Sequence, residues 1–421
     1  MSSTESAKST AKGAEEVRFE QLPAASGVPT EDAVAGVLDE ASRMGASDLF
    51  LCSAENFLEV GVRHLGLVRT LMRVTREDGR RWLSHIKVLA GIPLDNRRKP
   101  NEGRWIRLHP NGHKTDLRVN TIPTLYGEDF AIRLLERDSS LQTLEGLGLA
   151  PPTLRQLVTM LHAPGGLILV TGPTSSGKTT TLYACLHYLN NGTRKINTIE
   201  DPIEYAVEGI RQSQVNPALD VDFPELLRSV LRQAPDIIMI GEIRDAMTAQ
   251  TAVRAANSGH LVLATLHAPT AAGAIQSMLA LGANPHFFGS SLRGVIAQRL
   301  VRSLCTNCRV TFDISDAPLT FEEVMPWLVD DEGKHLYTAT GCEQCHKTGY
   351  AGRTGVFEVM SVTPVLRKMI SDGAPGREIE TRAIADGMIE FRRGGLLKVA
   401  QGVTNTEEII RVVPSEYLGL S

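Results

Sequence analysis

The sequence predicts an α/β fold in which helices cover both faces of a parallel sheet, with a smaller α+β domain ahead of it. In the second half of the chain, the apolar runs LILVTG, IIMIGE and HLVLATLH are strand-sized and are separated by helical stretches. This alternation is typical of a parallel sheet. In the first third, the run FLEVGVRHLGLVRTL alternates in polarity and indicates strands and turns.

Length and composition agree with a multidomain globular protein. The 421 residues exceed the usual size of one domain, and 42% are hydrophobic and 22% charged. The formal net charge of −4 argues against a protein that binds nucleic acid over its whole surface. No apolar run approaches the ~20 residues that span a bilayer, and the N-terminus lacks a secretory signal, so a cytoplasmic chain is expected.

The first domain is predicted over residues 28–138, after a disordered, Ser- and Ala-rich tail at 1–27. A helix is expected in TEDAVAGVLDEASRMG, where apolar residues recur at helical spacing behind Thr30 as the cap. RWLSHIKVLAGI is a second helix candidate. The two strand-like runs around Pro123 and Gly127 predict a hairpin.

Residues 139–150 mix Gly and polar residues and are predicted to link this domain to a second one at 151–421. The second domain is expected to end in several helices from about Pro364. Thr404 and Glu407 have the spacing of a helix capping box in TNTEEIIRVV.

The stretch GPTSSGKT, from Gly172 to Thr179, has the spacing of a phosphate-binding loop and lies between an apolar strand and a helix. Its glycines let backbone N–H groups turn toward phosphates at the positive end of the helix. Lys178 should reach the β- and γ-phosphates, and the Thr179 hydroxyl should hold Mg²⁺. The expected nucleotide contacts are Gly172, Ser175, Ser176, Gly177, Lys178, Thr179 and Thr180.

Two groups of acids follow the loop. Glu242 ends the apolar strand in PDIIMIGEIRD, which is expected to neighbour the phosphate loop, where its carboxylate can orient Mg²⁺-bound water or accept a proton. Glu200, Asp201 and Glu204 are crowded together in TIEDPIEYAVEG, which favours metal or water positioning. The residues alone leave solvated surface acids as the alternative for both groups.

Histidine and arginine residues supply further candidates. His260 and His267 bracket a strand and should do different jobs, with His267 at the end of the strand suited to sensing a γ-phosphate. If the hairpin turn centres between Leu125 and Tyr126, Arg118 and Arg133 lie directly opposite each other. Because like charges so placed repel, an anion would explain the pair, although solvated edge arginines remain the alternative.

Six cysteines are present, and four of them form C-T-N-C at 305–308 and C-E-Q-C at 342–345. Two such turns, with Cys305, Cys308, Cys342 and Cys345, can complete a closed tetrahedral Zn²⁺ site, which is structural rather than catalytic. His346 could replace one ligand. Cys52 and Cys185 are interpreted as ordinary buried thiols.

Together these motifs resemble the secretion ATPase family that drives type II secretion and type IV pilus assembly. GPTSSGKTTTL is similar to its Walker A motif, TIEDPIE to its Asp box, LRQAPDIIMIGEIRD to its Walker B region, and SGHLVLATLHAPTA to its His box. CTNC…CEQCHKTGYAGRTGVFE is similar to the tetracysteine module of the assembly ATPases. The resemblance runs from about ASDLFL to the C-terminal helices.

The resemblance implies a PAS-like domain joined to a RecA-like ATPase domain with ATP, Mg²⁺ and structural Zn²⁺ as cofactors. It implies that Lys178 and Thr179 bind phosphate and Mg²⁺, that Glu242 acts on Mg²⁺ or water with help from Glu204, and that His267 lies in the γ-phosphate-sensing box. DLRVNT and AIRLL resemble the strands that carry the sensor arginines, here Arg118 and Arg133.

The resemblance also implies a homo-hexamer at the cytoplasmic face of the inner membrane that pushes a platform protein as pilin subunits are added. Family members usually carry a further N-terminal domain that docks on an accessory protein, whereas about 28 residues precede the PAS-like region here, so that docking mode is not carried over. Phe50 also replaces the usual histidine of A-S-D-[IL]-H, and H-L-G at 64–66 replaces a D-G turn, which indicates a diverged N-terminal domain.

Three alternatives stay open at the level of the sequence. The first is a retraction or DNA-uptake motor of the same family, although retraction ATPases typically lack the paired C-x-x-C turns. The second is a nucleic-acid-handling P-loop ATPase, which the mild acidity and the lack of aromatics interleaved with a basic stripe disfavour, so no nucleic-acid partner is expected. The third and weakest is a regulatory nucleotide-binding protein with little turnover.

Overall fold

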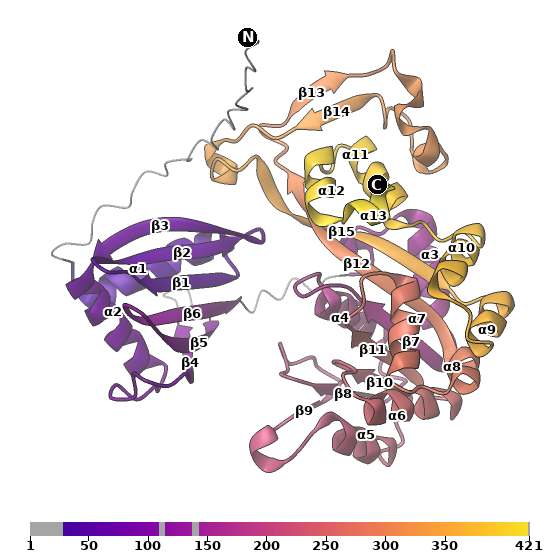
Figure 1. Ribbon diagram of the computed structural model, residues 1–421, viewed down its shortest axis with the longest axis horizontal. Coiled ribbons are helices and arrows are strands. Elements are labelled where there is room, and N and C mark those ends of the chain that lie inside the picture. The colour runs from indigo at the N-terminus through magenta and orange to yellow at the C-terminus, as the bar shows by residue number, and fades with distance from the viewer. Residues whose placement is uncertain (1–27, 109–113, 137–142, 420–421) are drawn as a thin grey trace, which may run out of the picture. The chain divides into compact units, whose positions relative to one another are not determined.

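The computed structural model describes residues 28–108, 114–136 and 143–419 (Figure 1). The chain divides into two compact units, Met1–Asp138 and Ser139–Ser421. The tail predicted over residues 1–27 lies outside the described residues. In the part of the chain that is described, no helix is both long and apolar enough to cross a membrane.

The first unit is built on a six-stranded sheet with the order β3-β2-β1-β6-β5-β4, in which every neighbouring pair is antiparallel. Its elements are α1 (Thr30–Arg43), β1 (Asp48–Ser53), β2 (Phe57–His64), β3 (Leu67–Thr75), α2 (Arg76–Leu89), β4 (Asn101–Leu108), β5 (Lys114–Thr124) and β6 (Gly127–Glu136). The small α+β domain that the sequence predicts is therefore present.

Both helices contribute to one core with alternate residues of the strands. Leu49 and Leu51 of β1 are buried in that core, whereas Asp48 and Phe50 face the other way, because successive strand residues point to opposite faces. The prediction that Thr30 caps the first helix is wrong, since the cap position is Pro29 and no side chain bonds there. α2 begins earlier than RWLSHIKVLAGI because the Thr75 side chain accepts the Asp78 N–H and caps it.

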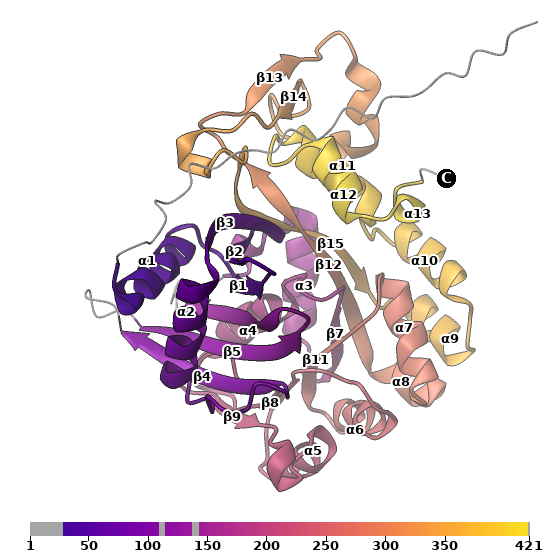
Figure 2. The same cartoon turned by 60° about the vertical axis from the view of Figure 1, so that its left-hand side comes forward.

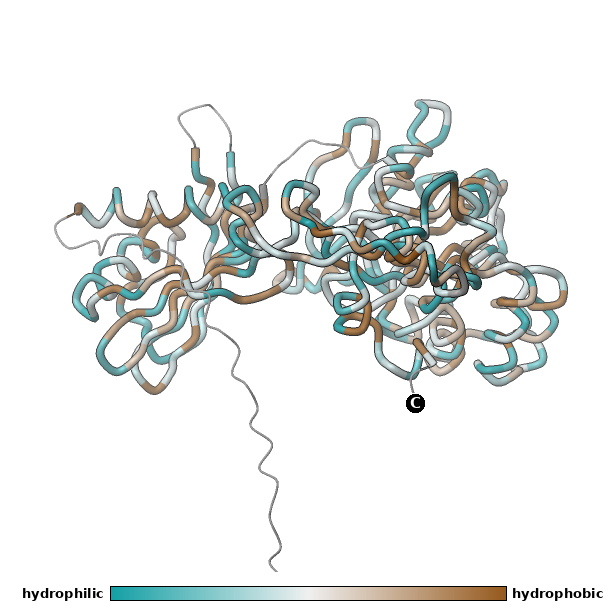
Figure 3. The backbone as a smooth tube through the Cα atoms, turned by 90° about the horizontal axis from the view of Figure 1, so that it is seen from above, coloured by the Kyte–Doolittle hydropathy of each residue, from teal (hydrophilic) through white to brown (hydrophobic). Residues whose placement is uncertain are grey.

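The second unit contains a seven-stranded sheet with the order β15-β12-β7-β11-β10-β8-β9. Its strands are β7 (Gly166–Thr171), β8 (Ile196–Glu200), β9 (Arg211–Gln214), β10 (Ile237–Ile240), β11 (Leu261–Leu266), β12 (Leu292–Leu304) and β15 (Tyr350–Ser361). All neighbours are parallel except β12 and β15. The predicted parallel sheet is confirmed, and Figure 3 shows how hydrophobic and hydrophilic stretches alternate along the chain.

Helices cover both faces of this sheet. Ile168 and Val170 of β7 lie in a core with α3 and α4, and Leu167 and Leu169 lie in another core with α5 to α8 and the C-terminal helices. The helices are α3 (Pro151–Leu161), α4 (Lys178–Leu189), α5 (Phe223–Leu231), α6 (Ala246–Asn257), α7 (Ala271–Ala280), α8 (Pro285–Ser291), α9 (Pro364–Ser371), α10 (Gly376–Ala385), α11 (Phe391–Ala400), α12 (Thr406–Val412) and α13 (Ser415–Leu418).

The long strands β12 and β15 run side by side and lead to a small hairpin, β13 (Val310–Asp313) and β14 (His335–Thr338) (Figures 1 and 2). The several helices predicted from Pro364 are present. The predicted capping box is wrong by one residue: Asn405 caps α12 by accepting the Glu408 N–H, and the Thr404 hydroxyl bonds the carbonyl of Arg302 instead.

The described part of the segment predicted as a linker, residues 143–150, packs on the second unit. It contains the short 3₁₀ helix η1 (Glu145–Leu147), and Leu144 and Leu147 are buried in the core shared with α3 and α4. Lys398 of α11 donates to the carbonyl of Gly148 at 2.6 Å, which fixes the end of the segment.

Candidate functional site

The loop between β7 and α4 has the backbone form that phosphate binding requires. Gly172 and Gly177 have positive φ angles of 147° and 89°, and Ser175 has a φ of 61°. A Cβ atom at Gly172 would lie 2.3 Å from the carbonyl oxygen of Gln298 in β12. The loop is therefore seated directly on a neighbouring strand, and only glycine fits at its first position.

Gln298 also forms a hydrogen bond with the C-terminal part of the phosphate loop. Its Nε2 donates to the carbonyl of Ser176 at 2.8 Å. The Ser176 hydroxyl is buried without a hydrogen-bond partner among the described residues. Ser175, Thr179 and Thr180 are exposed at the end of the loop and in the first turn of α4. The predicted nucleotide-contact residues are thus gathered in one loop and one helical turn.

Lys178 curls back over this loop. Its Nζ donates to the carbonyls of Gly172 at 2.9 Å and Pro173 at 3.0 Å, and lies 3.5 Å from Nδ1 of His267. Burial lowers the pKa of Lys178, and the nearby Glu242 carboxylate partly offsets that effect. The ammonium group is positioned where an anion seated on the loop would meet it.

The Glu242 carboxylate lies just beyond β10 and is held from two sides. Its Oε1 is 2.9 Å from Nε2 of His267, and its Oε2 accepts from Nε of Arg244 at 2.6 Å and from Nη2 at 2.5 Å. The hydrogen bond to Glu242 raises the pKa of Arg244. Glu242, His267 and Lys178 therefore form one continuous polar cluster.

The order of the strands explains how this cluster is arranged. β10 ends beside the phosphate loop without pairing with β7, because β11 lies between the two strands. His267 follows β11 directly, so its imidazole fills the gap between the carboxylate and the loop. His260, at the other end of β11, bonds the carbonyl of Ala255 through its ring at 2.9 Å, so the two histidines make different contacts.

The second acidic group splits into a structural member and two that face the site. Glu200 is buried, bonds the Tyr183 hydroxyl and the Thr198 hydroxyl at 2.5 Å each, and thereby joins β8 to α4. Burial, followed by the hydrogen bond to Glu200, raises the pKa of Tyr183. Asp201 lies 3.7 Å from Arg244.

These groups share a cavity of about 130 Å³ at the carboxyl ends of the parallel strands. Ligands bind at this edge in open α/β sheets. Its lining comprises Lys178, Thr179, Leu182, Glu200, Asp201, Pro202, Glu204, Phe223, Met239, Gly241, Glu242, Arg244, Thr265 and His267. A cation at the loop, a carboxylate and an imidazole in one cavity suit the transfer of a phosphoryl group to water.

The two arginines of the first unit lie as the sequence predicts. Arg118 and Arg133 are directly opposite each other in the β5–β6 pairing, which confirms the assumed register. Arg133 lies 3.2 Å from Asp48, whereas no ion pair to Arg118 is found among the described residues. Arg104 is opposite Arg118 on the other side, so three arginines cross adjacent strands in one row. Arg104 is paired with Asp116 at 2.5 Å, so Arg118 is the member of the row without a carboxylate partner among the described residues, and an added anion would be favourable there.

The four predicted metal ligands meet next to the β13–β14 hairpin. Cys305 and Cys342 have their Sγ atoms 3.9 Å apart, and Cys345 has its Sγ 3.8 Å from those of Cys308 and Cys342. Sulfur atoms at the corners of a tetrahedron around Zn²⁺, with bonds of about 2.3 Å, are about 3.8 Å apart. Among the described residues, the group of side chains that could hold a metal ion here consists of these four cysteines and does not include His346.

Nearby donors favour the thiolate forms of Cys342 and Cys345, whereas burial raises the pKa of Cys305 to about 11. Asn307 donates to Sγ of Cys342 at 3.3 Å and is the main cause of a pKa lowered to about 6. The N–H groups of Cys342 and Gly349 donate to Sγ of Cys345 at 3.2 Å each. The cluster fits a thiolate-bound metal ion. Of the other thiols, Cys185 is buried as predicted, but the prediction for Cys52 is wrong because it is exposed.

Two residues of the site were missed by sequence reasoning. Arg244 lies two residues after Glu242 in GEIRD, so its proximity to the carboxylate was a signal that could have found it. Gln298 gave no such signal, because it lies in β12, more than a hundred residues beyond the loop that it supports.

A phosphate loop on a central strand, with a carboxylate and a histidine from the next strands, defines a P-loop ATPase. The profile of the family described as Type II/IV secretion system protein matches residues 24–411. The chain belongs to this family and is an ATP hydrolase.

Similar proteins agree with this membership. The type II secretion system protein E of Dickeya dadantii is 44% identical over 380 residues, covering 90% of this chain and 75% of that protein. The type II secretion system ATPase E of Vibrio cholerae is 41% identical over 379 residues, covering 89% and 74%.

Solved structures share the fold. The ATPase DotB of Legionella pneumophila has a TM-score of 0.67 at 18% identity, covering 90% of this chain and 94% of that one. The pilus retraction motor PilT with bound ADP has a TM-score of 0.60 at 24% identity, covering 89% and 95%. The fold is thus shared by ATPases that differ widely in sequence.

Proposed function

We propose that this chain is a cytoplasmic, homo-hexameric motor that hydrolyses ATP to power assembly of type IV pili or type II secretion pseudopili. It acts at the inner membrane through a platform protein. The observation that carries the proposal is the meeting of Lys178, Glu242 and His267 in one cavity, in a chain of the secretion ATPase family. The paired C-x-x-C turns favour assembly over retraction.

The residues of the cavity divide the work as follows. Loop N–H groups between Gly172 and Thr180 and the Lys178 ammonium bind the phosphates of ATP. Thr179 and Glu242 would hold Mg²⁺, which would neutralise charge on the phosphates. Glu242 also accepts a proton from the attacking water with help from Glu204, and His267, between Glu242 and Lys178, senses the γ-phosphate.

The arginine row supplies charge for the transferring phosphoryl group. Arg118 has no ion pair among the described residues, and Arg133 shares a single carboxylate, Asp48, at 3.2 Å. Guanidinium groups suit an anion with several oxygens. We infer that domain closure brings Arg118 and Arg133 to the nucleotide, and that this closure is the movement passed to the platform protein.

The cysteine cluster holds Zn²⁺ in a structural role. Cys305, Cys308, Cys342 and Cys345 fill all four positions of a tetrahedral ion, which leaves none for substrate. Zn²⁺ there would hold the two C-x-x-C turns together, next to the exposed strand β13.

The decisive variant is Glu242→Gln, which keeps the shape of the side chain and removes its charge. We expect it to bind ATP still, while turnover falls by about 10²–10⁴-fold, the range for loss of a general base. Turnover close to that of the unchanged protein refutes the assignment.

The arginines require a separate comparison. Arg118→Ala and Arg133→Ala should lower turnover far more than nucleotide binding. Arg73→Ala is the matched control, because Arg73 lies on the same sheet in β3 and is paired with Glu59 at 3.0 Å. Equal losses of turnover and binding, or equal losses in the control, would contradict the role.

Stimulation of the ATPase separates the motor from the nucleic-acid-handling alternative. We expect activity to rise with the cytoplasmic part of a platform protein in the presence of lipid, and to stay level with single-stranded DNA. The reverse result would favour the alternative. A homo-hexamer should be found by mass photometry in the presence of nucleotide.

A further inference from the structure

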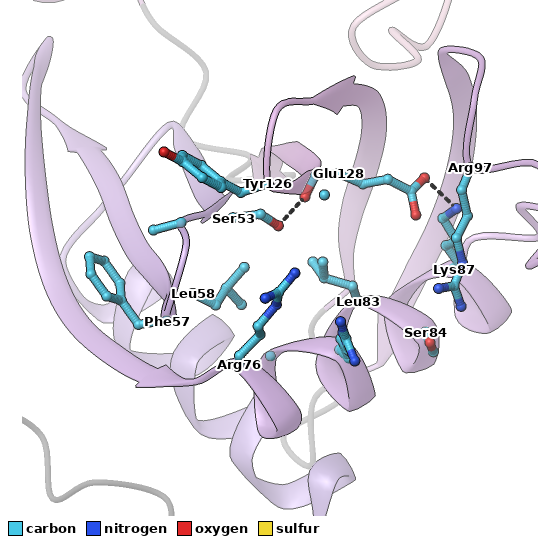
Figure 4. A pocket seen from close by; sticks show the side chains of 14 residues that line it. Ser53, Phe57, Leu58, Arg76, Leu83, Ser84, Lys87, Arg97, Tyr126 and Glu128 are labelled. Carbon is cyan, nitrogen blue, oxygen red and sulfur yellow. Dashed lines mark hydrogen bonds and ion pairs between the residues drawn. The ribbon is translucent and has the colours of Figure 1, made fainter.

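A second cavity, of about 270 Å³, lies wholly within the first unit (Figure 4). It is formed by the end of β1 and start of β2, by one side of α2, and by the β5–β6 turn. We call it the basic cavity, and its lining residues are Ser53, Ala54, Phe57, Leu58, Arg76, Gly79, Arg80, Leu83, Ser84, Lys87, Arg97, Tyr126, Gly127 and Glu128.

One face of α2 supplies much of the wall. Its lining residues recur three or four positions apart, from Arg76 through Arg80 and Leu83 to Lys87, so they form a single stripe along the helix. Gly79 permits this placement, since a Cβ atom there would lie 2.7 Å from Cβ of Leu58 in β2. The helix thus approaches β2 closely at this point.

The cavity is strongly cationic. Four of its side chains, those of Arg76, Arg80, Lys87 and Arg97, are basic, and Glu128 is its single carboxylate, which gives a net charge of +3. Lys87 and Glu128 neutralise each other as a buried pair 2.5 Å apart. Three guanidinium groups therefore remain.

Those three guanidinium groups have no carboxylate partner within the described ranges of the chain. Arg76 donates to the carbonyl of Glu55 at 3.2 Å and Arg97 to that of Leu94 at 3.3 Å. Arg76 and Arg80 are four residues apart on one helix face, where like charges destabilise a helix. The next residue, Arg81, faces away from the cavity and is paired with Glu77 and Asp78.

The remaining walls are apolar and aromatic. Leu58 and Leu83 are buried beside the arginines, and Phe57 and Tyr126 stand on the side opposite the Lys87–Glu128 pair (Figure 4). A molecule in the cavity would meet guanidinium groups on one side and ring or aliphatic carbon on another. Pockets for small ligands have this combination of apolar walls and a few convergent polar groups.

We propose that the basic cavity binds a small soluble phosphate monoester with an apolar or aromatic portion, up to the size of a mononucleotide. Arg76, Arg80 and Arg97 bind the phosphate through their forked N–H groups, which match phosphate oxygens in pairs. Phe57 and Tyr126 contact the rest of the molecule. The site is independent of the phosphate loop, which lies in the second unit, and the proposal does not rest on the motor function.

The test counts binding sites by isothermal titration of the full chain with AMP, ribose 5-phosphate and inorganic phosphate. The unchanged protein should bind AMP at two sites per chain. The Lys178→Ala variant should bind AMP only at the basic cavity, and the Arg76→Ala/Arg80→Ala variant should bind it only at the phosphate loop. The combined variant should bind none. In the Lys178→Ala background, Arg81→Ala is the matched control and should leave AMP affinity unchanged, whereas Arg76→Ala/Arg80→Ala should lower it about 100-fold or more.

Two further arms keep the result unambiguous. Arg76→Lys/Arg80→Lys, which keeps the charge and loses the fork, should weaken AMP binding by less than the alanine pair, and it serves if the alanine pair does not fold. Absence of binding by all three probes to Lys178→Ala at millimolar concentration overturns the proposal, as does binding insensitive to both arginine pairs. Binding only to phosphatidic acid vesicles, lost on Arg76→Ala/Arg80→Ala, also overturns it, since the source would be a lipid headgroup.

Discussion

Replacing Gly172 by alanine tests whether the phosphate loop depends on the strand beneath it for its shape. The added Cβ would lie 2.3 Å from the carbonyl oxygen of Gln298 and 2.7 Å from Oγ of Ser176. The Gln298 carbonyl belongs to β12, which is paired with β7 on one side and β15 on the other, so it cannot rotate away as a side chain would.

The size of the effect follows from these distances. Ordinary contact begins at 3.4 Å, so the loop or the strand must give way by about 1.1 Å. In addition, the φ of 147° at this residue is one that L side chains rarely adopt, at a cost of about 1–3 kcal/mol. Because a displacement of about 1 Å can cost about 10²-fold where geometry is critical, we expect ATP affinity to fall about 100-fold.

The matched control is Gly192→Ala, in the loop after α4. Gly192 also has a positive φ, of 77°, but no atom lies within 4 Å of its hypothetical Cβ, so alanine there adds backbone strain without a clash. Fluorescence titration with an ATP analogue measures nucleotide affinity. Thermal melting measures the loss of stability that both variants share, because each places alanine at a positive φ. If Gly172→Ala binds nucleotide as tightly as Gly192→Ala, the proposed seating of the loop on β12 is wrong.

Four further outcomes are expected. Lys178→Ala should abolish ATP hydrolysis, as measured by phosphate release, while the melting temperature stays near that of the unchanged protein. Arg244→Gln should lower turnover about tenfold with little change in ATP affinity, because the Glu242 carboxylate loses the group that orients it. Burial raises the pKa of Glu358 from 4.5 to about 7, so stability should fall as pH rises through that window, by about 3 kcal/mol in total; Glu358→Gln should remove this slope in urea melts at pH 5 and pH 8. Chelation of metal or Cys308→Ser should lower the stability of the region around residues 305–345 before ATP binding is lost, which limited proteolysis followed by nucleotide titration would show.

Several features were predictable because they depend on residues close together in the chain. The phosphate loop is a run of eight residues whose glycines and lysine act within one turn, and the two C-x-x-C turns each aim a pair of thiolates locally. The position of the hairpin turn fixed the register that sets Arg118 opposite Arg133, since each residue further from the turn pairs with its counterpart. Local spacing was sufficient in each case.

The errors at Thr404 and Cys52 arose because contacts between distant segments decided what the local pattern left open. Thr404 and Asn405 both suit a helix cap, and the Thr404 hydroxyl is bound to the carbonyl of Arg302 in β12, which leaves the cap to Asn405. Cys52 has the composition of a core residue but lies on the outer face of its strand, because Leu49 and Leu51 already take the inner positions.

The sequence by itself determined the ATP-binding loop and the set of four cysteines with metal-ligand spacing, because both depend on short motifs. Only the tertiary structure decided that β11 separates β10 from β7, and hence that His267 stands between Glu242 and Lys178. It also decided that Gln298 lies under the loop and that the helix α2 lines a cationic cavity. The order of strands in a parallel sheet depends on how distant segments pack, and no spacing along the chain encodes it.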